Sequence, residues 1–183
     1  MFPVLQEIIF RAHTALFAQK VCSTIQDLTK QQYMVQAKSL SKGLYQSSGS
    51  FAVFMHFTGD ILGDCIITTD WDTALRFCKV ADPSHFPDEI EAQRECCAEV
   101  FGEYLNIAVG LTLPELGKKY GRLMQIPPCA VFGQLRMSQV ASGNVDISGP
   151  TGEMRCTLSV NMTNIRQIDG FSNSSVRGAA GPA

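Results

Sequence analysis

One long amphipathic stretch constrains this chain more than any other feature, and we expect it to form a helix from about Pro87 to Leu113. At 3.6 residues per turn, its apolar side chains fall on one side of the helix. They are centred on Phe101, Leu105, Ala108 and Thr112. The other side is polar and carries, at steps of three and four residues, Glu95, Glu99, Glu103, Asn106 and Gly110.

Two glycines accompany the polar side of this helix. Gly102 lies at its edge and Gly110 lies within it. Glycine destabilises a helix interior by roughly 1 kcal/mol relative to alanine, because it has more conformational freedom to lose. Two glycines in one stretch therefore predict that another group packs close to this side.

The same stretch resembles a known motif. Gly102 to Gly110, with Glu103 and Asn106 three positions apart, is similar to the Glu-x-x-Asn helix of the CheX/CheC family of chemotaxis phosphatases. The surroundings agree with that family. They include an acid at Glu99, two strands and a short helix before the stretch, and a strand entered by two prolines after it. The single motif points to CheX, because CheC resembles two such helices in tandem.

This resemblance covers about residues 48 to 162 and implies both a fold and an activity. The fold is α+β, with a mixed or antiparallel sheet, long helices packed on one face and the pseudo-duplicated arrangement of CheC. The activity is hydrolysis of the aspartyl-phosphate of CheY-type response regulators. The resemblance also implies that Asn106 orients the hydrolytic water and that Glu103 pairs with the regulator's lysine.

Further expectations follow from the resemblance. Glu99, Gly102 and Gly110 would belong to the partner-binding surface around the two catalytic residues. The chain would need no cofactor of its own, since the phosphorylated regulator supplies Mg²⁺. It would act in the cytoplasm as a homodimer. The first helix, which would be the pseudo-symmetric mate of the motif helix, has Phe10 three residues after Glu7, so it lacks a second motif.

Other interpretations stay open at this point. Glu103 and Asn106 also fit solvated polar residues opposite a core face, because Glu-x-x-Asn occurs by chance in many helices. A non-catalytic binding module would dock to a response regulator or another signalling partner without hydrolysis, and a purely structural subunit is a third class. Glu95, Glu99 and Glu103 offer three carboxylates, but three acids without histidine are more typical of a solvated face, so we expect no metal site.

Composition sets the wider limits. The 183 residues are 45% hydrophobic and 17% charged, which fits a single domain at residues 1–165, followed by a tail at 166–183 that we expect to be disordered. A net charge of −2 without a basic run disfavours nucleic acid and anionic membranes as partners. No apolar run approaches the roughly 20 residues of a membrane span. The seven cysteines form no C-x-x-C pair, and we expect them to be buried, reduced thiols.

The rest of the chain predicts alternating helices and strands. Period-2 alternation indicates two hairpins, with strands at 51–57 and 61–68 and at 145–148 and 153–162. Gly63 indicates a bulge, Asp70 or Thr69 should cap a short helix, and Pro114 should stop or kink the long helix. The other expected elements are a helix at 3–19, a loop at 27–32, an edge strand at 33–37, a linker or turn at 39–50 and a strand at 129–137.

Overall fold

The computed structural model describes residues 2–161, without the side chains of residues 2–10, 41–43, 138–141 and 161. Its helices are α1 (Phe2–Thr29), α2 (Trp71–Ala81) and α3 (Ile90–Tyr120). Its strands are β1 (Met34–Gln46), β2 (Phe51–Gly59), β3 (Leu62–Thr69), β4 (Leu123–Gln125), β5 (Cys129–Phe132), β6 (Arg136–Gly149) and β7 (Gly152–Asn161). The tail predicted at 166–183 lies outside the described residues.

The described strands form one antiparallel sheet in the order β1-β6-β7-β3-β2-β4, and β5 also pairs with β2. The order has approximate symmetry about its centre, where β3 pairs with β7. A hairpin lies on each side of the centre, and the outer strand of each hairpin pairs with strands from the other half of the chain. This is the pseudo-duplicated α+β arrangement that we expected.

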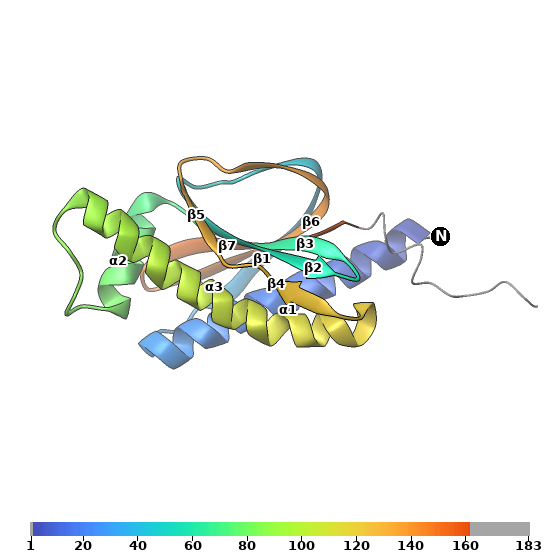
Figure 1. Cartoon of the computed structure of the whole chain (residues 1–183), viewed down its shortest axis with the longest axis horizontal. Helices are drawn as coiled ribbons and strands as arrows, with labels where there is room; N and C mark the ends of the chain where they lie inside the picture. Colours follow the sequence, from blue (N-terminus) through green and yellow to red (C-terminus); the bar gives the residue numbers. More distant parts are fainter. Residues whose placement is uncertain (1, 162–183) are drawn as a thin grey trace, which may run out of the picture.

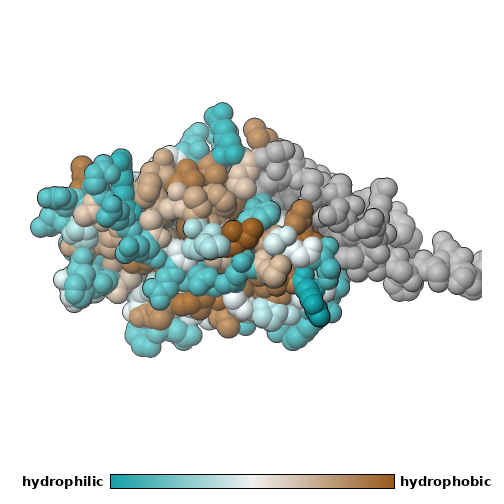
Figure 2. All heavy atoms as spheres, in the orientation of Figure 1, coloured by the Kyte–Doolittle hydropathy of each residue, from teal (hydrophilic) through white to brown (hydrophobic). Residues whose placement is uncertain are grey.

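The two long helices cross each other on one face of the sheet (Figure 1). α1 covers β6 and β7, whereas α3 covers β2 and the short strands beside it. The main core lies between these helices and the sheet, as expected. Its largest fully buried side chains include Phe17, Phe51, Phe57, Phe77, Phe101, Leu105 and Ile147. On the surface seen in Figure 2, apolar side chains are interspersed among polar ones.

α1 is longer than the helix expected at 3–19. Val21 and Ile25, one and two turns beyond Phe17, are buried against the sheet, so the apolar side of the helix continues past residue 19. The helix ends where Lys30 adopts a positive φ of 62° and its N–H still bonds to the carbonyl of Gln26 at 2.9 Å. The loop that we expected at 27–32 therefore starts only after Thr29.

β1 replaces most of the linker or turn that we expected at residues 39–50, of which only residues 47–50 lie between the strands. It is the edge strand of the sheet, as predicted for 33–37, but it continues to Gln46 and pairs with β6 along its length. Two register shifts interrupt the pairing, between Val35 and Lys38 and between Ser41 and Gly43. Its serines and lysines obscured the strand pattern, because an edge strand tolerates polar side chains that an inner strand would not.

α3 starts at Ile90 rather than Pro87, and it runs through Pro114 instead of ending there. An interior proline costs a helix about 3 kcal/mol, since it lacks an N–H and its ring collides with a carbonyl one turn earlier. Beyond it, Leu116 is fully buried and Tyr120 is 7% exposed. Burying a large apolar side chain stabilises by about 1.5–3 kcal/mol, so the last turns more than offset the proline.

By length and composition alone, α3 is also apolar enough to cross a membrane, contrary to the expectation that no stretch approaches such a span. Half of its most apolar 18-residue window is buried inside the fold, so much of this apolar surface packs within the protein. The helix is thus accounted for by its packing on the sheet.

The expectations for the hairpins and the helix cap are confirmed, whereas those for one strand and one cysteine are wrong. The β2–β3 and β6–β7 hairpins are present, and the Asp70 carboxylate caps α2 by accepting the backbone N–H of Thr73 at 2.7 Å. The strand expected at 129–137 is instead split into β5 and β6 by a bend at Gly133, where φ is 122°. Cys129 is exposed, although Cys65, Cys78, Cys97 and Cys156 are buried as expected.

Gly63 does not form the expected bulge, because β3 pairs with β7 in unbroken register on both sides of it, and its pairing with Phe57 continues the register of β2 with β3. Its role is close packing. A Cβ atom at this position would collide with the carbonyl oxygen of Ser159 and with the ring of Phe57.

Replacing Phe101 by alanine should remove about 3–5 kcal/mol from the free energy of unfolding. The ring is 1% exposed and packs against Phe51 and Phe77, with centroids 5.0 Å away in both cases. Urea denaturation measures the loss. Leu111→Ala, at a position 47% exposed on the same helix, should change stability by less than about 0.5 kcal/mol. Equal losses in the two variants would contradict this account of the core.

Stability should also fall as the pH is lowered through about 6.5. Burial, aided by the charge of Lys119, lowers the pKa of His13, whose ring packs edge-on against Tyr120. The unfolded chain therefore binds a proton at His13 more readily than the folded chain does. The contribution of His13 to the free energy of unfolding is complete above the unfolded pKa and is lost as the pH falls below it. Urea denaturation between pH 8 and 5.5 should show a shallower dependence for His13→Gln. An equal dependence on pH in His13→Gln and the wild type would contradict this account.

Candidate functional site

The central turns of α3 present the predicted site residues on one side. Glu99, Glu103, Asn106 and Gly110 are exposed, whereas Gly102 is buried at the edge of the group. The opposite side of these turns is buried in the core through Phe101, Leu105, Ala108 and Thr112. The helical spacing predicted this division, and the structure confirms it.

The segment at residues 125–128 runs along the polar side of α3. A Cβ atom on Gly102 would lie 3.4 Å from Cγ of Pro128. A Cβ atom on Gly110 would lie 3.9 Å from Oε1 of Gln125. The prediction that a group packs close to this side is therefore confirmed at Gly102, whereas Gly110 has room for a methyl group. Asn106 lies between them, one turn from each.

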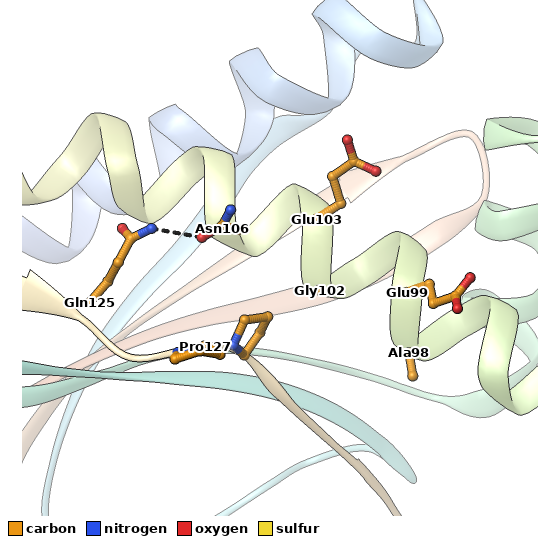
Figure 3. A pocket seen from close by; sticks show the side chains of 8 residues that line it. Ala98, Glu99, Gly102, Glu103, Asn106, Gln125 and Pro127 are labelled. Atoms are coloured by element: carbon orange, nitrogen blue, oxygen red, sulfur yellow. Dashed lines mark hydrogen bonds between the residues drawn. The ribbon is translucent and has the colours of Figure 1, made fainter.

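A hollow of about 460 Å³ opens between α3 and this segment (Figure 3). Its walls are formed by Ala98, Glu99, Gly102, Glu103, Asn106, Gln125, Pro127 and Pro128. Four of the five predicted site residues thus line one cavity. Gly110 instead lines an adjoining hollow of about 500 Å³, together with Pro114, Met124 and Gln125.

Gln125 is the site residue that the sequence analysis missed. Its Nε2 donates a hydrogen bond of 2.7 Å to Oδ1 of Asn106, across 19 residues of sequence (Figure 3). No local pattern indicates this contact, because it depends on where β4 joins the sheet. The Pro127–Pro128 pair was noted only as the entry to a strand, and it also forms the floor of the hollow.

The acidic side chains of the site are not neutralised within the described part of the chain. Neither Glu99 nor Glu103 forms an ion pair or a side-chain hydrogen bond with another described residue, and both are exposed. In Figure 3 the Glu103 carboxylate extends away from Pro127, on the outer side of the helix. Among the described residues, no three carboxylate, imidazole or thiol groups cluster closely enough to hold a metal ion. The arrangement offers a free anion and a fixed carboxamide one turn apart.

Comparisons with known proteins bear on the fold. No protein-family model and no curated protein sequence matches the chain. Among solved structures, the chemotaxis protein CheX from Desulfovibrio desulfuricans aligns with a TM-score of 0.69 and 14% identity, over 82% of this chain and 99% of that one. The CheX–CheY–BeF₃–Mg²⁺ complex from Borrelia burgdorferi gives 0.61 and 21%, over 80% and 96%. FliY from Thermotoga maritima gives 0.61 and 12%, over 92% and 95%.

These similarities show that the chain has a CheX-like fold, as the motif resemblance implied. The match extends over nearly the whole of each neighbouring chain and over about four fifths of this one.

Gly110→Ala should stabilise the protein by about 0.5–1 kcal/mol, because alanine is the better helix former and the nearest atom would be at ordinary contact distance. Thermal or urea denaturation measures the change. Gly63→Ala is the matched opposite, since its added methyl group collides with β7, and it should be strongly destabilising. A loss of stability in Gly110→Ala would show that the chain itself needs glycine there.

Proposed function

We propose that this chain is a phosphatase acting on the aspartyl-phosphate of CheY-type response regulators in chemotaxis or two-component signalling. The observation that carries the proposal is that Glu103 and Asn106 are both exposed, one turn apart, on the long helix of a CheX-like fold. One neighbour with this fold was solved as a complex with CheY, BeF₃ and Mg²⁺. We further propose that the protein acts in the cytoplasm as a homodimer.

The reaction needs little chemistry from the chain, because an acyl phosphate is already activated. A water oxygen attacks the phosphorus, the bond to the regulator's aspartate oxygen breaks, and its electron pair stays on the carboxylate. The products are aspartate and inorganic phosphate, and the water's proton passes to phosphate or solvent. The carboxamide of Asn106 would hold that water in line, since it can both donate and accept hydrogen bonds. The regulator would supply Mg²⁺.

Glu103 would hold the two proteins in register. Its carboxylate has no cationic partner among the described residues, so it is free to pair with the regulator's active-site lysine. Such a pair gains strength when docking excludes water from it. Glu99 would extend the acidic surface toward the same partner.

Gly110 supports a docking role for this side of the helix. Glycine costs the helix about 1 kcal/mol relative to alanine, yet a methyl group at this position would meet no atom of the chain closer than 3.9 Å. The bare backbone would instead admit a closely approaching partner. Gly102 differs, because it is buried, and a Cβ atom there would contact Pro128 of the chain itself.

The decay of a phosphorylated response regulator in Mg²⁺, with and without this protein, tests the proposal. We expect the wild type to accelerate decay and Asn106→Ala to lose about 100-fold of that acceleration, because an unpositioned water reacts slowly. Glu103→Gln should mainly weaken binding to the beryllofluoride-activated regulator. Glu95→Gln, two turns away on the same exposed side, is the matched control and should behave like the wild type.

The outcomes separate the proposed enzyme from the other interpretation. Binding of the activated regulator without faster decay would favour a non-catalytic docking module. Acceleration that persists in Asn106→Ala would refute the role given to the carboxamide. If no regulator encoded with this protein is bound or dephosphorylated, both functions fail.

A further inference from the structure

The hydrogen bond from Gln125 to Asn106 joins two parts of the site that are distant in sequence. Asn106 lies on α3, and Gln125 is the last residue of β4. Both side chains are exposed, so burial does not force them together. At 2.7 Å between Nε2 and Oδ1, the contact is a short amide–amide hydrogen bond.

The backbone that carries Gln125 is firmly anchored. Gln125 pairs with Phe57 of β2, whose side chain is fully buried in the core. The next residue, Ile126, donates its N–H to the carbonyl of His56 at 2.8 Å. Two prolines with restricted backbone angles follow. The side chain of Gln125 therefore starts from a fixed point of the sheet and reaches to the helix.

Gly110 leaves open space beside this contact. A Cβ atom there would lie 3.9 Å from Oε1 of Gln125, which is an ordinary contact distance. The contact thus has a rigid base at β4 and an open position beside it on α3.

The direction of the hydrogen bond determines what Asn106 offers to a partner. In the observed direction, Oδ1 of Asn106 accepts from Gln125 and uses one of its two lone pairs. The amino group of Asn106 then lies on the side away from Gln125 (Figure 3). If both amides were reversed, one of the two N–H groups of Asn106 would be bonded to Gln125 instead, and only the other would remain for a docked partner.

We propose that Gln125 is a positioning residue that holds the Asn106 carboxamide with its amino group and one oxygen lone pair turned toward a docked regulator. This inference rests on the proposed phosphatase function. The Asn106 amide is oriented before docking, so binding of the regulator does not have to restrict its rotation. Gln125 itself takes no part in breaking or forming bonds to phosphorus.

Three substitutions at one position separate the direction of the bond from its mere presence. Gln125→Lys retains only a donor and should preserve the observed direction. Gln125→Glu retains only an acceptor and should reverse the Asn106 amide. Gln125→Met keeps the length of the side chain without a strong hydrogen bond. Met124 is 65% exposed on the same strand, so Met124→Lys and Met124→Glu control for the added charge.

The first readout needs no regulator. Side-chain ¹⁵N–¹H spectra of the free protein identify the Asn106 amino protons by their loss in Asn106→Ala. We expect these protons to move downfield in Gln125→Glu, because they then donate to a carboxylate, and to stay near their wild-type positions in Gln125→Lys. Identical Asn106 resonances in the wild type, Gln125→Glu and Gln125→Met would overturn the proposed contact.

The second readout is phosphatase kinetics combined with binding of the beryllofluoride-activated regulator. We expect Gln125→Met to lose about tenfold or more in kcat with unchanged Kd, Gln125→Glu to lose more, and Gln125→Lys to stay within about threefold of the wild type after charge correction. A Gln125→Met variant as active as the wild type, or a Gln125→Glu variant more active than Gln125→Lys, would overturn the proposal. An inactive wild type would instead refute the phosphatase function on which it rests.

Discussion

The position of the candidate site depends on the burial of one side of α3. Phe101 packs with Phe51 and Phe77 beneath the helix, and Leu105 is fully buried one turn later. These contacts fix the rotation of the helix about its axis. A turn by one residue, or 100°, would bring the Glu103 carboxylate toward the core, where an unpaired charge costs many kcal/mol. The burial of the hydrophobic side thus directs the polar side toward solvent, and the rigid helix keeps Glu103 and Asn106 at a fixed spacing.

The sequence predicted the elements whose own side chains form a regular pattern. The hairpins, the Asp70 cap and the central turns of α3 depend on residues within a few positions of each other. Residues 20–29 of α1, most of the strand β1 and the turns beyond Pro114 were missed because distant parts of the chain stabilise them. β1 needs β6 as its neighbour, and the last turns of α3 need the core to offset a proline.

The site shows the same division. Glu99, Gly102, Glu103, Asn106 and Gly110 occupy one helix, so their common side could be predicted from spacing alone. The opposite wall could not be predicted, because Gln125 and Pro128 reach the helix only through the pairing of β4 and β5 with β2. The pseudo-symmetric fold carries the predicted motif on α3 alone. The corresponding helix, α1, contributes mainly its packing against the other half of the sheet.

The exchange of edge strands between the two halves has a consequence for synthesis on the ribosome. β1 lies near the start of the chain, but among the described strands it pairs only with β6. The side chains of Gln36 and Ser148, which bond across this pair, are 112 residues apart. The backbone groups of β1 therefore stay without their sheet partners until most of the protein has emerged. Long-range pairing of this kind slows folding. Lysines and serines on β1 are well suited to that interval, since polar edge strands resist pairing with other chains.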